Sequence, residues 1–183
     1  MRAFIAVELT SSVMNSIAGI QAELKKSRGD VKWVPPDICH ITLKFLGEIK
    51  DDQVEALRAI MIDCAQKTKP FPVTVNTVGA FPTMAKPNII WLGLTDEHNI
   101  LATLAGEIED KVNTLGFIKE VRPFTPHITI GRTRPGSHKT ISQALQMMDA
   151  PDQPLDVSGL TLFHSTLSSA GPTYKPLFQI PLK

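Results

Sequence analysis

Two short segments of the sequence place a histidine and a threonine two residues apart. The segment CHITLKFLG contains His40 and Thr42, and the segment PHITIGR contains His127 and Thr129. The chain has only five histidines, so a repeated His-Ile-Thr triplet is a feature to explain. Imidazole has an ordinary pKa of about 6.5 and exchanges protons near neutral pH. Hydroxyls donate hydrogen bonds to anions, so these residues together suit acid–base chemistry on a phosphate.

The spacing of the triplets suggests how they are presented. Side chains two residues apart in a β-strand lie on the same face, so His40 and Thr42 should share a face while Ile41 and Leu43 enter the core. The second triplet should behave in the same way, with its isoleucines turned inward. Two such strands facing one cleft would surround a small space with two imidazoles and two hydroxyls.

That arrangement fits the hydrolysis of a phosphate ester. A base takes a proton from water on one side of the phosphorus, and an acid gives a proton to the leaving oxygen on the other. One neutral and one protonated imidazole could do both without a metal. A single His-x-Thr on a strand is more often an ordinary half-buried polar face. The second copy, which also follows a proline and precedes an apolar run, favours function.

A metal site is the less favoured interpretation of these histidines. Zinc generally needs three or four protein ligands. The remaining histidines, His98, His138 and His164, have no ligand spacing to either triplet. We therefore expect no metal and no cofactor.

Periodic apolar positions predict strands alternating with helices, which is typical of an α+β fold. The first helix, for example, carries Val13, Ile17, Ile20 and Leu24 on one stripe. Each half of the chain has a His-containing strand between two helices, which suggests two related lobes. We expect strands at residues 2–9, 31–34, 40–46, 71–81, 88–94, 127–133, 155–167 and 174–183, with a hairpin joining the fourth and fifth, and helices at 13–29, 54–64, 101–115 and 138–148.

The composition limits the classes of protein. The chain has 183 residues, of which 43% are hydrophobic and 20% charged, as in ordinary soluble globular proteins. A net charge of +1 gives no global attraction to nucleic acid or membrane, so any anion site must be built locally. The two cysteines, Cys39 and Cys64, are expected to be buried thiols rather than a disulfide. We expect one cytoplasmic domain over residues 1–183, monomeric and without a membrane segment.

Five blocks of the sequence together resemble a known family. They are MRAFIAVEL, VKWVPPDICHITLKFLGEI, GAFPTMAKPNIIWLGL, RPFTPHITIGR and STLSSAGPTYKPL, and they cover nearly the whole chain in order. The sequence resembles the two-histidine (2H) phosphoesterase superfamily, and within it the LigT-like RNA 2′,3′-cyclic phosphodiesterases, also called 2′-5′ RNA ligases.

This resemblance implies a bilobal α+β fold, in which two pseudo-symmetric lobes with antiparallel sheets enclose a central cleft and the helices lie outside. It implies hydrolysis of a terminal 2′,3′-cyclic phosphate on RNA to a 2′-phosphate. His40 would protonate the leaving 3′ oxygen, His127 would activate water, and Thr42 and Thr129 would hold the phosphate. The family's name also implies reversible 2′-5′ joining of RNA ends, but in water hydrolysis should prevail.

Three neighbours of the motifs bear on substrate binding. Lys44 is four residues after His40, so alternation predicts that it faces the cleft and offsets phosphate charge, although a solvated lysine at the rim is an equal alternative. Phe45 should then lie in the core. Arg132 is five residues after His127, and strict alternation would turn it away, but a bend at Gly131 could return it to contact the phosphate, where the family often has arginine.

Two alternatives to this enzyme remain open from the sequence. The cleft could bind a nucleotide or an RNA end without turnover, although binding alone does not need two titrating histidines. The substrate could also be a small cyclic nucleotide instead of RNA, which a comparison of rates on mononucleotides and oligonucleotides would distinguish.

Overall fold

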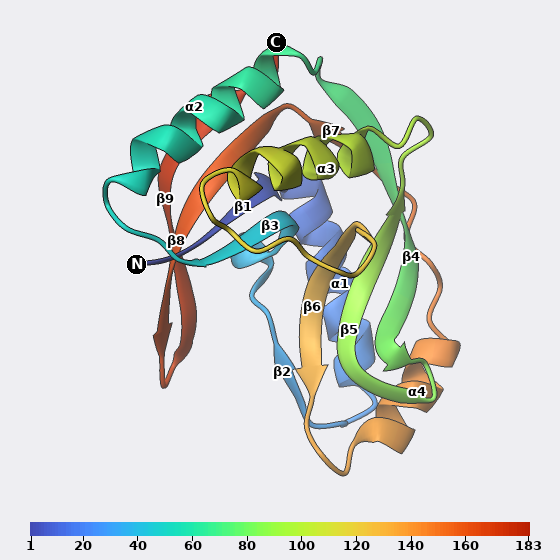
Figure 1. The fold of residues 1–183 in the computed structure, drawn as a ribbon. Coiled ribbons are helices and arrows are strands. Elements are labelled where there is room, and N and C mark those ends of the chain that lie inside the picture. Colours follow the sequence, from blue (N-terminus) through green and yellow to red (C-terminus); the bar gives the residue numbers. More distant parts are fainter.

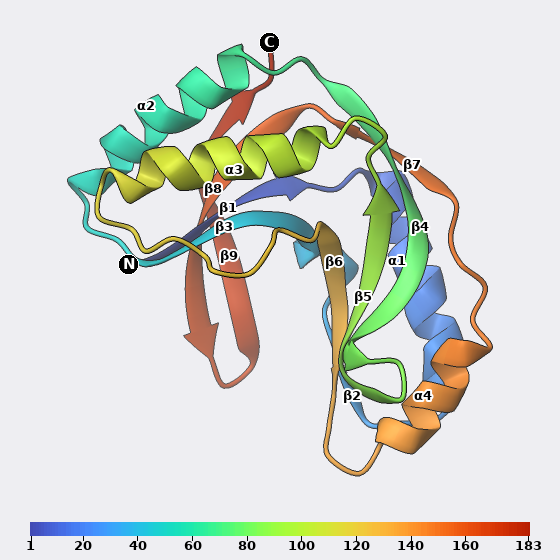
Figure 2. The ribbon, with the colours of Figure 1, turned by 45° about the vertical axis from the view of Figure 1, so that its right-hand side comes forward.

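Strand-forming segments from the whole chain join into one antiparallel sheet that curls strongly, with the helices on its outer surface (Figures 1 and 2). The structure is a computed structural model that describes residues 1–183. The strands are β1 (Arg2–Glu8), β2 (Val31–Trp33), β3 (His40–Glu48), β4 (Phe71–Thr83), β5 (Lys86–Thr95), β6 (His127–Thr133), β7 (Gln153–Val157), β8 (Gly159–Ser168) and β9 (Gly171–Pro181). The helices are α1 (Ser11–Lys25), α2 (Gln53–Gln66), α3 (Ile100–Asn113) and α4 (His138–Gln146), and a 3₁₀ turn, η1, covers Pro36–Ile38.

The strand order divides the molecule into two lobes. The order is β7-β4-β5-β6-β3-β1-β8-β9, with β2 added beside β6, so the two His-containing strands β3 and β6 are central neighbours. Helices α2 and α3 pack on the lobe that contains β3, whereas α1 and α4 pack on the lobe that contains β6. The predicted bilobal α+β fold is confirmed.

The lobes do not coincide with the two halves of the sequence. The first lobe takes β1 and β3 from the beginning of the chain and β8 and β9 from its end. Helix α1, although it precedes β3, packs against β7 and α4 in the second lobe. The expected strand at 155–167 is in fact two strands that break at Ser158, because β7 pairs with β4 while β8 pairs with β1.

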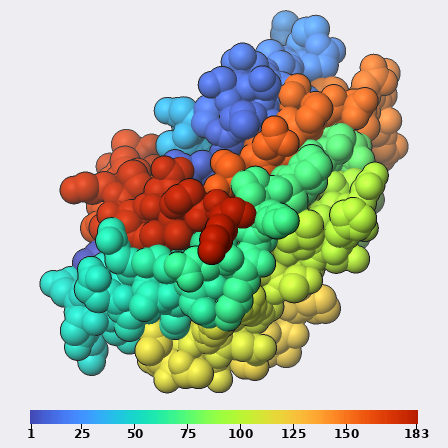
Figure 3. Space-filling model, turned by 90° about the horizontal axis from the view of Figure 1, so that it is seen from above, coloured from blue at the N-terminus to red at the C-terminus, as the bar shows by residue number.

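Most other elements lie where the sequence predicts them. The hairpin of β4 and β5 is confirmed. The first helix ends at Lys25, several residues before the expected Gly29. At the other end of the chain, the backbone N–H of Lys183 donates to the carbonyls of Ala65 and Thr68, so the C-terminus lies against the end of α2 (Figure 3). No helix has the length and apolar character needed to cross a membrane.

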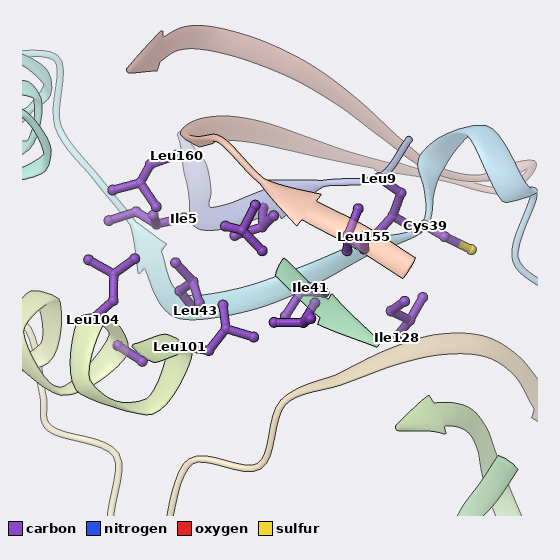
Figure 4. Packing of buried hydrophobic residues seen from close by; sticks show 14 of the residues in the cluster. Ile5, Leu9, Cys39, Ile41, Leu43, Leu101, Leu104, Ile128, Leu155 and Leu160 are labelled. Carbon is purple, nitrogen blue, oxygen red and sulfur yellow. The ribbon is translucent and has the colours of Figure 1, made fainter. Parts of the chain in front are cut away.

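The core lies between the sheet and its outer helices. Ile41 and Leu43 on β3 are buried near Leu101 and Leu104 of α3, and Ile128 on β6 is buried beside them (Figure 4). Burial of each such side chain contributes about 1.5–3 kcal/mol relative to exposure. This packing holds the inward faces of β3 and β6, so the opposite faces of the same strands are free to form a site.

Both cysteines are buried and free, as predicted. Burial is the main cause that raises the pKa of the Cys39 thiol to about 12 and that of Cys64 to about 11. Both thiols therefore stay protonated and unreactive at neutral pH.

Candidate active site

The two histidine strands lie side by side at the centre of the sheet. Ile41 on β3 pairs with Ile128 on β6 in antiparallel register, and both isoleucines are fully buried. In this register His40 lies opposite Thr129, and Thr42 lies opposite His127. The two imidazoles and two hydroxyls therefore emerge on the face opposite to the buried isoleucines and around the same point.

Each imidazole is held by its own strand in the same way. The Nδ1 atom of His40 lies 2.9 Å from the carbonyl oxygen of Ile38, and Nδ1 of His127 lies 2.7 Å from that of Thr125. A carbonyl only accepts, so in both rings Nδ1 carries the proton that is donated. This fixes the tautomer and leaves each Nε2 free to exchange a proton with a substrate.

Aromatic rings surround both histidines. The ring of Phe4 stacks on His40 with centroids 4.7 Å apart, and Tyr174 meets His40 edge-on at 5.3 Å. In the other lobe, Phe81 meets His127 edge-on at 5.2 Å. These contacts fix the rings and partly exclude water, which strengthens electrostatic interactions in the site.

The pKa of His40 is lowered from its ordinary value, and three effects determine this shift. Burial is the main cause, because it penalises the charged ring. The hydrogen bond to Ile38 opposes this effect, and the charge of His127 adds to the lowering. The charged form of His40 is therefore less favoured in the free protein than it would be in an exposed imidazole.

A β-bulge follows the threonine in each motif. On β3, Thr42 pairs with Ala6 but Lys44 pairs with Ile5, so Leu43 is an extra residue relative to β1. On β6, Ile130 is the extra residue relative to β5, because Thr129 pairs with Trp91 and Gly131 with Ile90. Such a bulge shifts the alternation of side chains by one position. Both strands consequently have two consecutive inward residues after the threonine and an exposed residue next.

The bulge in β3 overturns two predictions from simple alternation. Lys44 points away from the cleft and is only 6% exposed, so its predicted contact with phosphate is wrong. Its Nζ instead donates to Oε1 of Glu109 on α3 at 2.6 Å and to the carbonyl of Ile118 at 2.7 Å. The predicted core position of Phe45 is also wrong, since this ring is 70% exposed and lies 6.1 Å from Phe4.

The equivalent bulge in β6 turns Arg132 to the cleft face. Arg132 pairs with Ile89, which lies on the same face of β5 as the partners of Thr129 and His127. Arg132 is exposed. Burial raises the pKa of the Tyr174 phenol in the other lobe, and the positive charge of Arg132 opposes this rise. The extra residue that returns Arg132 is Ile130, whereas Gly131 provides close packing, because a Cβ there would meet the Trp33 ring at 3.0 Å.

A buried amide that was not predicted from the sequence supports this second bulge. Gln21 on α1 is 3% exposed, and its Nε2 donates to the carbonyls of Ile130 at 3.0 Å and Val34 at 2.7 Å. The Ile130 carbonyl also accepts the backbone N–H of Val34. The sequence does contain a signal for this buried amide, because Gln21 lies within the apolar stripe of an amphipathic helix.

Glu8 is a second residue of the site that was not predicted from the sequence. It pairs with His40 across β1 and β3, so it lies on the same face of the sheet as that residue, but its carboxylate reaches toward β8 and β9. It accepts hydrogen bonds from Thr161 Oγ1 at 2.9 Å and Gln179 Nε2 at 2.6 Å. No group of three or more His, Cys, Asp or Glu side chains in the structure is arranged to hold a metal ion.

Comparisons with known proteins agree with this architecture. A family model described as LigT-like phosphoesterase matches residues 7–91 and, again, residues 92–174. An RNA 2′,3′-cyclic phosphodiesterase of Aquifex aeolicus is 32% identical and covers 95% of this chain and 93% of its own. A crystal structure of a Thermus thermophilus protein matches 100% of this chain and 98% of its own chain, with a TM-score of 0.84 and 27% sequence identity. The structure of E. coli LigT complexed with 3′-AMP matches 99% of this chain and 97% of its own chain, with a TM-score of 0.77 and 25% identity.

Proposed function

The chain belongs to the LigT-like phosphoesterase family, and from this premise we propose that it hydrolyses a terminal 2′,3′-cyclic phosphate on RNA to a 2′-phosphomonoester. The observation that carries the proposal is the pair of histidine–threonine couples on neighbouring central strands, with each imidazole held through Nδ1 and each Nε2 left free. We propose further that residues 1–183 act as one bilobal catalytic domain, without a metal or cofactor.

In the proposed mechanism the two imidazoles divide the proton transfers. His127 Nε2 takes a proton from water as the water oxygen bonds to phosphorus. His40 Nε2 gives its proton to the 3′ oxygen as the bond between that oxygen and phosphorus breaks. The products are a 3′-hydroxyl and a 2′-phosphomonoester, and the two histidines have exchanged protonation states, which solvent restores.

The remaining cleft residues stabilise the phosphate. Thr42 and Thr129 each donate a hydroxyl hydrogen bond to a phosphate oxygen, and the Arg132 guanidinium offsets its charge with stronger, charge-assisted hydrogen bonds. A 5′-hydroxyl of a second RNA that attacks the cyclic phosphate in place of water would give a 2′-5′ linkage by the same ring opening, with the 3′ oxygen again as the leaving group. Because water is in great excess, hydrolysis is the reaction that we assign.

A synthetic RNA ending in a 2′,3′-cyclic phosphate tests this proposal directly. We expect the protein to convert it to a product whose phosphate remains on the 2′ oxygen, identified by chromatography against 2′- and 3′-phosphate standards. Activity should persist in EDTA, because no step requires a metal. A protein that binds this RNA and leaves it uncut would instead be a binding module, and a 3′-phosphate product would contradict the assigned leaving oxygen.

The pH dependence of the reaction follows from the state of His40. The proton donor must be protonated while the base is neutral, and burial lowers the pKa of His40 in the free protein. We therefore expect a bell-shaped profile of kcat/KM whose acidic limb, which reports the lower of the two pKa values, lies below the ordinary histidine value of about 6.5. A bound phosphate anion favours the charged ring of His40, so the profile of kcat should lie at higher pH than that of kcat/KM.

NMR titration of the His40 ring checks this prediction independently of turnover. The free protein should show a pKa below about 6.5, and a bound nucleotide phosphate should raise it. The His127→Ala variant should raise the pKa of His40 in the free protein, because it removes a nearby positive charge. A His40 pKa above the ordinary value in the free protein would contradict the expected lowering by burial.

A further inference from the structure

We propose that Phe45 and the cavity beside it bind a second nucleobase of the RNA, that of the nucleotide on the 5′ side of the terminal one. This inference rests on the proposed function and adds to it a site that selects RNA chains over mononucleotides. It follows from three observations, which are the exposure of Phe45, the row of rings that leads to it from His40, and the shape of the adjoining cavity.

Phe45 is a large apolar side chain whose exposure has a structural cause. The bulge at Leu43 turns it out of the core and onto the face that carries His40 and Thr42. The ring remains 70% exposed, whereas its neighbour Phe4 is 3% exposed. Exposed rings beside a phosphate site are the usual platforms for single-stranded RNA, because every base can stack on them.

The position of Phe45 suits the second base rather than the first. The terminal ribose must lie against His40, which protonates its 3′ oxygen in the proposed mechanism. From His40, the first ring step is 4.7 Å to the buried Phe4, and the second is 6.1 Å to Phe45. Phe45 therefore lies two ring steps from His40, and we assign it to the nucleotide on the 5′ side of the terminal one.

A cavity of about 410 Å³ opens beside Phe45, away from the catalytic histidines. Its volume is in the range of known small-ligand sites, so it can hold a single base. Ile118, which is 88% exposed, lines the cavity together with Phe45, so a planar base has apolar contacts from both β3 and the segment that precedes His127. Lys50 and Glu48 also line it, and because Glu48 is paired with the N-terminal amine, Lys50 is the lining charge that we assign to the backbone phosphate.

Two glycines lie in the wall of the cavity. Gly47 and Gly116 both line it, and each has a positive φ, of 70° and 90°. A Cβ added at either position would meet no atom within 4 Å, so these residues border open space. The conformation itself favours glycine at both positions, because other residues rarely adopt it.

Kinetics on two substrates test the inference. The substrates are a nucleoside 2′,3′-cyclic phosphate and a dinucleotide that ends in the same cyclic phosphate, and the measurement is the ratio of their kcat/KM values. In the wild-type protein we expect this ratio to favour the dinucleotide. The Phe45→Ala variant should lower the ratio by about 10- to 100-fold, since losing one base–ring stack has an effect of this size.

Further variants distinguish stacking from disturbance of the site. Phe45→Trp should keep the dinucleotide preference, and Ile118→Ser should reduce it. Val121→Ser is the matched control, because Val121 is 95% exposed on the same segment but does not line the cavity, and it should leave the ratio unchanged.

The possible outcomes separate this inference from the proposed function. A Phe45→Ala variant with a wild-type ratio overturns the second-base site, and so does an equal loss on both substrates, which would place Phe45 against the terminal nucleoside. In either case hydrolysis by the wild-type protein still supports the proposed function. A wild-type protein that opens neither substrate contradicts the function and the inference together.

Discussion

Replacing His127 with alanine is expected to lower kcat/KM for RNA ending in a 2′,3′-cyclic phosphate by about 10²- to 10⁴-fold. This is the usual contribution of a positioned general base, the role that the proposed mechanism gives to His127. The fold should be retained, because the side chain is at the cleft surface and its loss opens no void in the core. Steady-state kinetics at the pH optimum, with circular dichroism to confirm folding, would measure the effect.

The same loss is expected for His40→Ala, and the double variant should be little worse than either single one, because the two groups act as a unit. His138→Ala is the matched control, since that histidine begins α4 on the outer surface of the sheet and should not affect the rate. Retention of activity within tenfold in His127→Ala would contradict the assigned base. If His127→Ala lost activity but His40→Ala did not, the role assigned to His40 would be contradicted.

Replacing Lys44 with alanine is expected to reduce the free energy of unfolding by about 3 kcal/mol, near the lower end of the range for breaking a buried ion pair. The lysine side chain is 5% exposed and that of Glu109 is 19% exposed, so removing the amine leaves a poorly solvated carboxylate. The carbonyl of Ile118 also loses its donor. The backbone N–H of Glu120 still donates to Glu109, which limits the loss. Urea denaturation monitored by circular dichroism would give the change.

Lys26→Ala is the matched control for this second prediction. Lys26 also pairs with a glutamate, Glu23, but the two side chains are 72% and 58% exposed. Solvent screens such a pair, so its loss should cost no more than about 1 kcal/mol. The Lys44→Ala variant should keep most of its activity per folded molecule. If Lys44 bound the phosphate instead, the variant would show the opposite pattern, with unchanged stability and a large loss of activity.

The corrections to the predicted site have one physical origin. Alternation along an isolated strand places Lys44 in the cleft and Phe45 in the core, but the structure reverses both. A bulge is decided by how a strand pairs with its neighbour, here β1 for β3 and β5 for β6. Those partners come from other parts of the chain, so no window of sequence around the motif contains the information. The same applies to Arg132, which reaches the cleft through the bulge at Ile130.

The division of the chain into lobes also depends on distant pairing. The break at Ser158 falls inside a continuous strand-like run, and it separates a strand that pairs with β4 from one that pairs with β1. Likewise Glu8 and Gln21 acquire their places in the site from partners far away in sequence, such as Gln179 and Ile130.

Residue types and their spacing were enough to predict the chemistry of the site and the strands that carry it. Residue type sets the proton-exchanging imidazoles and the hydroxyl donors, and the two-residue period of a strand sets which of them share a face as far as the first bulge. The residues beyond each threonine that face the cleft could not be predicted in this way. The reason is that alternation is a local property of one strand, whereas register and bulges minimise the free energy of several strands and helices packed together.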